Sequence, residues 1–443
     1  MVNFVYNLLL WLLLPVLVPY HAYRSLSRGR RTALLERLGL LASSELGGIA
    51  GAEGTILVHA VSVGETMAAL PLLKGLRARF PGKRLIISNV TETGRSVALK
   101  SGAADLCIYF PFDYPFAVRS VLEKTRPDLV VIMETEIWPN FIGVARELGI
   151  PVVLANGRIS DRSLGRYLRF SWFFRPVLQK LSALCMQTPE DASRIVSIGA
   201  APGTVHVAGN LKYDIPVSRV DAEQVAGLKE RYAIPSGCFV FTAASTHEGE
   251  EAEVLSAYRA LLAHRGASFM ILAPRHPERA PGVAELLGEG GFPFRLRSRL
   301  DRSEPPLAAG GVLLLDTVGE LAGLYKASDL VFVGGSLVPT GGHNPLEPAS
   351  CGVPVLFGPH MENFREIAAL FLRHGGGVQV PDRNGLTDQL LLLSDDAAGR
   401  AEIGRRGAGI LEESAGATGR HLEVMAARLL GKKPGGGSGV THG

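Results

Sequence analysis

The sequence predicts an α/β protein with two doubly wound, Rossmann-like domains that face a central cleft, preceded by a membrane anchor helix. The domains are predicted from two alternations of short apolar strands with helices, one over residues 55–208 and one that begins at residue 238. This alternation is typical of parallel sheets with both faces covered by helices. The anchor is predicted because residues 1–23 contain no Asp, Glu, Lys or Arg.

The chain is predicted to have four parts. Residues 1–23 form the anchor and residues 24–214 an N-terminal domain. Residues 215–431 form a C-terminal domain, which begins with a linker that contains Pro216. The tail at residues 432–443 is rich in glycine and is expected to be disordered.

The composition excludes several classes of protein. The 443 residues are 47% hydrophobic and 20% charged, which permits large cores and argues against disorder. The net charge of +4 is too small to indicate a nucleic-acid partner. The four cysteines are far apart and form no CxxC motif, which is typical of reduced thiols rather than a disulfide framework or a zinc site.

The anchor prediction rests on the nearly continuous apolar stretch at residues 4–20, because roughly 20 apolar residues span a bilayer. Arginines follow this stretch at positions 24, 28, 30 and 31, whereas a signal peptide carries its positive charges before the apolar region. The pattern favours an uncleaved anchor with the later domains on the cytoplasmic side. Pro15 and Pro19 leave open a helix that dips into one leaflet without crossing the membrane.

The glycine-rich stretch at residues 334–347 is the principal candidate for a ligand site. It follows an apolar strand, and its far end reads as a helix start, with Asn344 as N-cap, Pro345 at the first helical position and Glu347 three residues after the cap. Backbone N–H groups at such a start form an anion site, His343 adds a donor, and Glu347 could accept from sugar hydroxyls. The alternative is that these residues only cap a helix, but a polar loop at the carboxyl end of an α/β strand is a usual ligand position.

Acidic side chains follow two strands of the N-terminal half. Glu65 opens a helix and could act as a general base for a hydroxyl group, or could simply favour the helix dipole. Glu134 and Glu136 follow the strand at residues 129–133 and, being two residues apart, would face the same side of an extended chain. Such a pair could bind a cation, raise the pKa of one member or hydrogen-bond a sugar, and helix capping is the alternative.

Arginine and large aromatic side chains are mixed over residues 156–175. Arg162, Arg166 and Arg169 are at helical spacing and are expected to share one face. Arginines beside large aromatic rings suit a membrane surface or an anionic lipid. An ordinary solvated face over a core stripe is the alternative.

Further polar clusters follow strands of the second half. The run at residues 245–248 has capping-box spacing and could donate to a phosphate, and Arg275 is well suited to the same ligand. A helix opens near the same edge at residues 318–320. No second histidine completes an HExxH motif, and no GxGxxG follows the first strand, which argues against a zinc protease and a dinucleotide cofactor. The two halves together suggest an anionic lipid acceptor and an activated nucleotide donor.

In combination, these segments resemble the Kdo transferases, the 3-deoxy-D-manno-octulosonate transferases of lipopolysaccharide assembly. The matching segments cover nearly the whole chain after the anchor, in order: residues 59–65, 133–140, 209–214, 244–251, 274–279 and 334–348. The resemblance implies an inverting enzyme of GT-B architecture at the inner membrane. It would move Kdo from CMP-Kdo to the 6′-hydroxyl of a lipid A precursor, lipid IVA, with the acceptor on the N-terminal domain and the donor on the C-terminal domain.

The resemblance also implies residue roles. Glu65 matches the general base, and Glu134 or Glu136, with Lys212, matches groups that stabilise the transition state. The CMP-binding set corresponds to Pro274, Arg275, Val318, Gly319, Glu320, Asn344, Pro345, Leu346 and Glu347. CMP-Kdo is then a substrate, and no nicotinamide cofactor or bound metal is expected. Two other functions stay open: a membrane-tethered glycosyltransferase that uses another nucleotide sugar, and a non-catalytic nucleotide-binding module.

Overall fold

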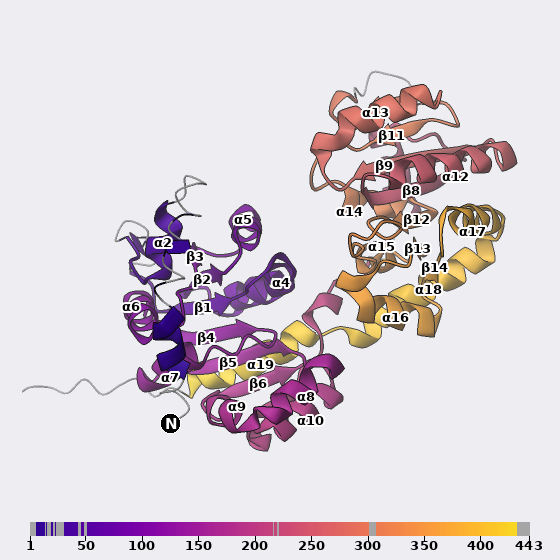
Figure 1. Ribbon diagram of the computed structural model, residues 1–443. Coiled ribbons are helices and arrows are strands. Elements are labelled where there is room, and N and C mark those ends of the chain that lie inside the picture. Colours follow the sequence, from indigo (N-terminus) through magenta and orange to yellow (C-terminus); the bar gives the residue numbers. More distant parts are fainter. Residues whose placement is uncertain are drawn as a thin grey trace, which may run out of the picture. The chain divides into compact units, whose positions relative to one another are not determined.

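The computed structural model describes residues 6–13, 15, 19–20, 23, 31–42, 46–47, 51–215, 217–218, 221–300 and 307–431. The chain divides into two units (Figure 1). Unit 1 is Met1–Asp214 with Gly416–Gly443, and unit 2 is Ile215–Ala415. Each unit contains a seven-stranded sheet, and all strand pairs described are parallel, so the predicted class of two doubly wound α/β domains is confirmed.

The sheet of unit 1 has the strand order β3-β2-β1-β4-β5-β6-β7. Its strands are β1 (Thr55–His59), β2 (Arg84–Asn89), β3 (Leu106–Tyr109), β4 (Pro127–Met133), β5 (Val152–Gly157), β6 (Ala183–Met186) and β7 (Val205–Val207). The order reverses between β1 and β4, which pair with His59 opposite Ile132. Open α/β sheets bind ligands beyond the carboxyl ends of their strands at such a reversal.

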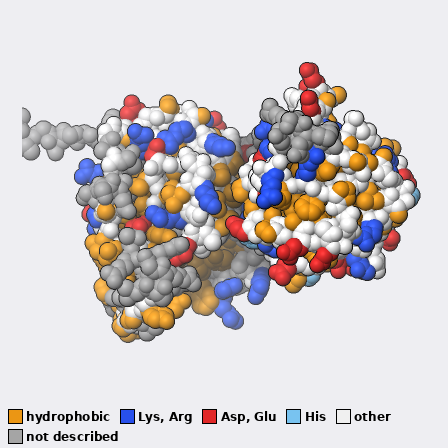
Figure 2. Space-filling model, turned by 90° about the horizontal axis from the view of Figure 1, so that it is seen from above, with side chains coloured by type: hydrophobic (Ala, Val, Ile, Leu, Met, Phe, Trp, Pro, Cys, Tyr) orange, Lys and Arg blue, Asp and Glu red, His pale blue; other side chains and the backbone are white. Residues whose placement is uncertain are grey.

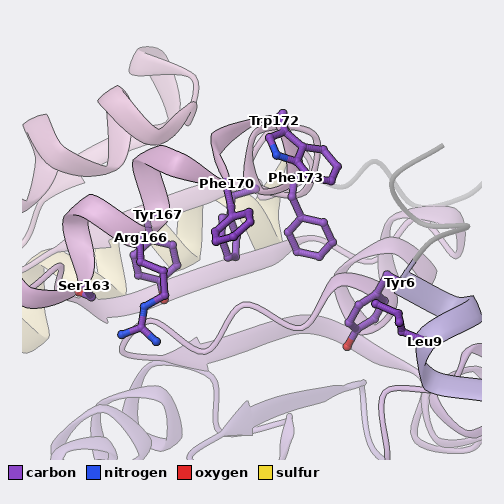
Figure 3. Close-up of a pocket in the computed structure, with 9 residues that line it drawn as sticks. Tyr6, Leu9, Ser163, Arg166, Tyr167, Phe170, Trp172 and Phe173 are labelled. Carbon is purple, nitrogen blue, oxygen red and sulfur yellow. The ribbon is translucent and has the colours of Figure 1, made fainter. Parts of the chain in front are cut away.

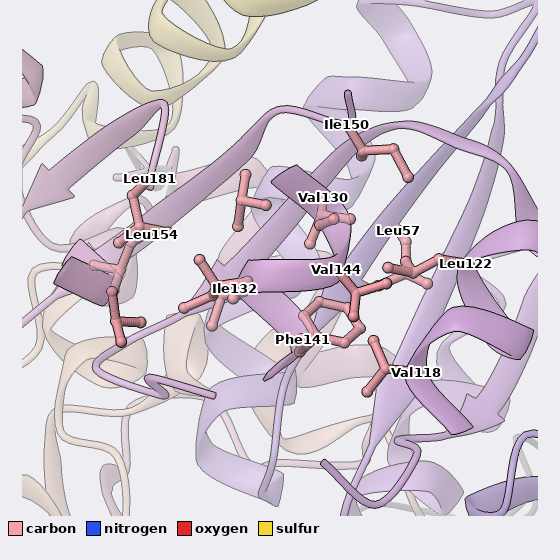
Figure 4. Close-up of a cluster of buried hydrophobic side chains, with 14 of the residues drawn as sticks. Leu57, Val118, Leu122, Val130, Ile132, Phe141, Val144, Ile150, Leu154 and Leu181 are labelled. Carbon is pink, nitrogen blue, oxygen red and sulfur yellow. The ribbon is translucent and has the colours of Figure 1, made fainter. Parts of the chain in front are cut away.

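Helices cover both faces of this sheet. They are α2 (Arg31–Arg37), α4 (Val63–Arg79), α5 (Glu92–Ser101), α6 (Pro115–Thr125), α7 (Pro139–Glu147), α8 (Asp161–Arg169), α9 (Ser171–Leu178), α10 (Pro189–Ile198) and α19 (Ala417–Leu430). Alternate strand residues enter two separate cores, as the period of two in a strand requires. Leu57 and Val130 pack with α6, α7, α9 and α10 (Figure 4), whereas Ile56 and Val131 pack with α4, α5 and α19.

Helix α19 corrects the predicted domain boundary, because residues 215–431 were assigned to the C-terminal domain and this helix belongs to unit 1. Its Met425 is buried in the same core as Leu72 of α4. The backbone N–H of Asn156 donates to Nε2 of the buried His421 at 3.0 Å. The local pattern shows an amphipathic helix but not which of the two sheets covers its apolar face.

Replacing Met425 with Ala should lower the free energy of unfolding of unit 1 by about 2–5 kcal/mol, because Met425 is fully buried and the change leaves a cavity. All three tryptophans, Trp11, Trp138 and Trp172, lie in unit 1, so urea unfolding followed by tryptophan fluorescence reports on this unit. The control is Leu430→Ala on the same helix, where the side chain is 78% exposed. Equal effects of the two changes would contradict the packing described for α19.

The sheet of unit 2 has the order β10-β11-β9-β8-β12-β13-β14, with the reversal between β8 and β12. Its strands are β8 (Phe239–Thr246), β9 (Ser268–Pro274), β10 (Phe294–Leu296), β11 (Val312–Leu314), β12 (Leu330–Val333), β13 (Val355–Phe357) and β14 (Val378–Gln379). Its helices are α11 (Ala222–Arg231), α12 (Glu250–His264), α13 (Ala280–Glu289), α14 (Leu321–Leu324), α15 (Leu346–Ser350), α16 (Arg365–His374), α17 (Arg383–Asp395) and α18 (Ala397–Ser414). Phe241 and Leu272 pack on α12 and α13, and Val240 and Ile271 enter the core on the other face.

The N-terminal segment is described only in part. Residues 6–13 are helical, whereas most of the remainder of residues 1–30, where the anchor and its basic flank are predicted, lies outside the described residues, as does the tail at 432–443. The Tyr6 hydroxyl donates to Asp113 at 2.9 Å, and the Tyr114 hydroxyl donates to the Leu10 carbonyl at 2.7 Å. Within the described ranges no helix has both the length and the apolar character needed to cross a membrane. An anchor helix is therefore not shown, and membrane attachment stays a prediction.

Candidate functional site

Glu65 lies in the first turn of α4, directly after β1. Its carboxylate accepts hydrogen bonds from the Val61 N–H at 2.8 Å and the Ser62 hydroxyl at 3.0 Å, and Ser62 in turn caps the helix. The residue is only 8% exposed. Burial raises the pKa of Glu65 to about 7, and the charges of Glu134 and Glu136 act in the same direction, against the hydrogen bonds. A carboxyl group with this pKa can accept a proton at neutral pH.

Glu134 and Glu136 lie near Glu65 but not as neighbours on an extended strand, as the sequence analysis assumed. Glu134 follows β4 with a φ of 54°, in the left-handed region, so the chain turns at this residue. Burial raises the pKa of Glu136, and the charge of Glu134 adds to this effect. Glu134 lies 3.5 Å from the Lys212 ammonium group. The structure thus gathers the predicted catalytic residues of unit 1 at one edge of its sheet.

Sequence analysis missed Asn156, which holds the turn that carries Lys212. Asn156 is fully buried at the end of β5 and has a φ of 56°. Its side-chain oxygen accepts from the Leu211 N–H at 2.9 Å, at the start of the short 3₁₀ helix Leu211–Tyr213. Its carbonyl accepts from the Gln187 amide at 3.0 Å. The available signal was an Asn at a predicted strand end, a residue type that tolerates the left-handed conformation.

The glycine-rich loop after β12 already binds an anion, which is the carboxylate of Glu250. One oxygen of Glu250 accepts from the N–H groups of Gly335 at 2.7 Å and His247 at 2.9 Å. The other accepts from those of Ser336 and Leu337, each at 2.9 Å. Glu250 is fully buried at the start of α12. These loop amides are therefore not open to a ligand, and the capping box predicted at residues 245–248 is absent because α12 begins after it, at Glu250.

The helix start predicted at Asn344 is displaced by about one residue. Helix α15 begins at Leu346, with Pro345 in the N-cap position, and has five residues. Asn344 still holds this start, since its side-chain oxygen accepts from the Leu346 N–H at 3.1 Å and its amide donates to Glu347 at 3.3 Å. Burial raises the pKa of Glu347, whereas the hydrogen bond from Asn344 and the positive charge of Arg275 lower it.

The predicted nucleotide-binding residues fall into two groups. Arg275 follows Pro274, the last residue of β9, and its charge acts on Glu347 and therefore lies near the Asn344 loop. Glu320, by contrast, is engaged elsewhere: it accepts from the Arg297 guanidinium at 2.8 and 3.0 Å and from the Tyr232 hydroxyl at 3.0 Å. The neighbouring Val318 is 84% exposed, and Gly319 has a φ of 89°.

The predicted arginine–aromatic face borders a cavity of about 650 Å³ in unit 1 (Figure 3). The cavity is lined by Tyr6, Leu9, Ser163, Arg166, Tyr167, Phe170, Trp172, Phe173 and Phe174. Phe170 and Trp172 are 44% and 59% exposed. Arg162, Arg166 and Arg169 are also exposed, and none has a hydrogen bond or ion pair among the described residues. The charge of Glu136 acts on Tyr167, so this face adjoins the cluster of acidic side chains formed by Glu65, Glu134 and Glu136.

Lys and Arg side chains are interspersed with acidic and apolar ones on the face drawn in Figure 2.

Comparisons with known proteins identify the family. The model of the family described as "3-Deoxy-D-manno-octulosonic-acid transferase (kdotransferase)" matches residues 32–215. The chain is 33% identical over 426 residues to the 3-deoxy-D-manno-octulosonic acid transferase of Haemophilus influenzae, covering 96% of this chain and 98% of that protein. The chain belongs to the Kdo transferase family. It is therefore related to glycosyltransferases, as its resemblance to that family predicted.

Two further comparisons concern a second relative in sequence and a solved structure that is similar in fold. This Kdo transferase family member is 35% identical over 380 residues to the 3-deoxy-D-manno-octulosonic acid transferase of Bordetella pertussis, covering 84% of this chain and 86% of that one. In fold it is similar to the crystal structure of the UDP-GlcNAc 2-epimerase from Neisseria meningitidis bound to UDP-GlcNAc, with a TM-score of 0.55 and 15% identity over 84% of this chain and 99% of that one. This second likeness concerns the fold alone.

Proposed function

We propose that this member of the Kdo transferase family is an inverting GT-B enzyme that moves Kdo from CMP-Kdo to the 6′-hydroxyl of a lipid A precursor such as lipid IVA. The observation that carries the proposal is the cluster of Glu65, Glu134, Glu136 and Lys212 at the carboxyl edge of the unit 1 sheet. The family supports Kdo as the transferred sugar. CMP-Kdo serves as a substrate, and the proposal requires neither a nicotinamide cofactor nor a metal.

In this mechanism, Glu65 takes the proton of the acceptor hydroxyl as its oxygen attacks the anomeric carbon. The raised pKa of Glu65 suits the task, because the proton acceptor must be deprotonated before attack and basic enough to hold the proton afterwards. Glu134 or Glu136 and Lys212 stabilise the charge that develops on the sugar. Lys212 is tied to Glu134 at 3.5 Å, so the two act as a pair.

In unit 2, Arg275 carries the negative charge of the departing phosphate. Its guanidinium has no hydrogen bond or ion pair among the residues that the structure describes, so it is available to an anion. Asn344 and Glu347, whose carboxyl group senses the Arg275 charge, are assigned to the nucleotide and its sugar. The dipole of α15 contributes less than predicted, because five residues make a short helix.

We also propose that the protein works at the cytoplasmic face of the inner membrane. The proposal is supported by the apolar N-terminal sequence and by the exposed Leu9, Trp11 and Trp172, which are 55%, 52% and 59% exposed. Unpaired arginines beside these aromatic rings suit the phosphates of an anionic lipid. The partners would be CMP-Kdo, the lipid acceptor and the membrane surface, without a nucleic acid.

The direct test is mass spectrometry of lipid IVA after incubation with the protein and CMP-Kdo. We expect the lipid mass to increase by at least one Kdo residue, and the parallel reaction with another nucleotide sugar to give no product. A product formed only with the other nucleotide sugar would replace Kdo as the transferred group. If the protein binds CMP but transfers no sugar, it is a non-catalytic nucleotide-binding module.

Replacing Arg162, Arg166 and Arg169 together with Ser should weaken binding to anionic vesicles on the order of 100-fold, since each Lys or Arg near such a surface contributes about 1 kcal/mol and the three together about 3 kcal/mol. Binding by the unchanged protein should also fall at high salt. Co-sedimentation at low and high salt measures both effects. The matched control replaces Arg365, Arg373 and Arg383 of unit 2 with Ser, because the side chains of these arginines are also exposed and have no hydrogen bond or ion pair among the described residues. If the unit 1 variant binds as well as its parent, α8 carries an ordinary solvated face.

A further inference from the structure

Three histidines of unit 2 lie together at the carboxyl edge of its sheet. His247 follows β8, His276 follows β9 and His343 lies in the loop after β12, and these three strands are neighbours in the order β9-β8-β12. Nε2 of His247 lies 2.8 Å from Nε2 of His343. The two rings are nearly parallel, with centroids 5.1 Å apart, and the His276 ring stands edge-on to His247 at 6.0 Å.

A contact of 2.8 Å between two imidazole nitrogens requires one proton between them. In the uncharged pair, one ring therefore carries its proton on Nε2 and the other on Nδ1. One additional proton fits on the free Nδ1 and leaves the shared hydrogen bond intact, with an N–H on both Nδ1 atoms. A second would place two N–H groups against each other and break that bond. The pair can therefore take up a single proton.

Burial and the charged groups around the pair keep it neutral in the absence of a ligand. Burial, followed by the positive charge of Arg275, lowers the pKa of His343 to about 4, and His247 and His276 act in the same direction. Burial also lowers the pKa of His247; Glu250 opposes this shift, whereas His276, Arg275 and Arg279 add to it.

The charge of Glu250 partly offsets this positive region, but none of the nearby carboxylates is hydrogen-bonded to the histidine rings or to Arg275 among the described residues. Both oxygens of Glu250 are occupied by backbone N–H groups. Arg279 is paired with the buried Glu251 at 2.5 Å, and Glu347 is hydrogen-bonded by Asn344. Among the described residues, neither Nδ1 of the histidine pair nor the Arg275 guanidinium has a hydrogen-bond partner. An anion placed here would meet unused donors, and would favour the charged form of the pair.

We propose that His247 and His343, with Arg275, form an anion-binding subsite that takes up one proton as it binds a phosphate or carboxylate group. The proposal rests on the proposed function, in which the donor substrate supplies both groups, a phosphate from the nucleotide and a carboxylate from the sugar. The protonated pair presents donors to the anion and becomes neutral again when the anion leaves. Binding of the donor substrate is thereby coupled to the uptake of one proton by the histidine pair.

The test is isothermal titration of the full chain with CMP at pH 6, in two buffers with different ionisation enthalpies. The dependence of the heat on the buffer gives the number of protons taken up. The phosphate of CMP titrates near the same pH, so the deciding quantity is the difference between the unchanged protein and His343→Gln. We expect up to one proton fewer in the variant and roughly tenfold weaker binding, the effect of losing one charge-assisted hydrogen bond.

The affinity ratio between the two proteins should grow as the pH falls from about 8 towards 5.5, because the bound pair holds the additional proton. The control is His374→Gln, an exposed histidine in the last turn of α16, which should bind CMP as the unchanged protein does. Equal proton uptake in all three proteins would overturn the proposal.

Three further arms separate the possible outcomes. Cytidine lacks the phosphate, and free Kdo supplies the carboxylate alone, so the ligand that shows histidine-dependent proton uptake identifies the group bound. If CMP does not bind at all, the proposed donor is wrong. Binding of inorganic phosphate to the unchanged protein and to His343→Gln then tests the subsite by the same comparison.

Nitrogen NMR of the unliganded protein gives an independent test: one ring of the pair should be protonated on Nε2 and its neighbour on Nδ1. Two identical tautomers would exclude the shared proton.

Discussion

Replacing Glu65 with Gln should reduce Kdo transfer roughly 10²–10⁴-fold while leaving CMP binding unchanged, since the change removes one proton acceptor. Gln is close to Glu in size and can still accept the hydrogen bond of Val61 or Ser62, so the local structure is retained. The transfer rate of the unchanged protein should rise with pH through about 7, the pKa to which burial raises Glu65, and level off above it. The variant should lack this rise.

The matched control is Glu92→Gln. Glu92 is also an acid in the first turn of a helix that follows a strand of the same sheet, and its helix is capped by Thr91 as that of Glu65 is capped by Ser62. Rates and pH profiles for CMP-Kdo and lipid IVA, with CMP affinity measured separately, distinguish the two variants. If Glu65→Gln transfers Kdo at nearly the rate of the unchanged protein, Glu65 is not the base. If both variants lose activity equally, the effect is that of a first-turn charge.

Features set by the local pattern could be predicted from the sequence. Strands such as β1 and β4 are continuous apolar runs because both of their faces are buried, and the polar residues that follow them mark the carboxyl edge of a parallel sheet. For this reason Glu65 and Glu134 could be nominated together without knowledge of their distances. Lys212 was nominated only by the resemblance to the Kdo transferases. The start of α15 could be placed only to within about one residue, because Asn344 and Pro345 can share the capping role in more than one register.

Features that depend on contacts between distant segments could not be predicted. The apolar face of α19 could pack against either sheet, and the local sequence does not indicate that it packs against the sheet of unit 1. The turn at Glu134 depends on a left-handed φ that the sequence does not display. The glycine-rich loop was predicted to bind a ligand because its N–H groups converge. The sequence does not reveal that these N–H groups donate to the carboxylate of Glu250, which is 85 residues away from Gly335.

Replacing Glu250 with Gln should destabilise unit 2 by about 2–6 kcal/mol, because two of the four N–H groups bound by Glu250 would lose their acceptor at roughly 1–3 kcal/mol each. The carboxylate accepts from His247, Gly335, Ser336 and Leu337 at 2.7–2.9 Å, and it is fully buried. Gln has a single oxygen, and its amide nitrogen would face two donors. The loop that carries His343 and Asn344 should therefore lose its shape, and Kdo transfer should fall with it.

Hydrogen exchange measures this effect at the amides of Gly335, Ser336 and Leu337, where protection should fall at least about 30-fold, the equivalent of about 2 kcal/mol. The control is Glu248→Gln, since Glu248 lies two residues away, is exposed and should change stability by less than about 0.5 kcal/mol. Kdo transfer by this control should be unchanged. If the three amides keep their protection in Glu250→Gln, the loop holds its shape without the carboxylate, and its N–H groups become available to a bound anion as the sequence first indicated.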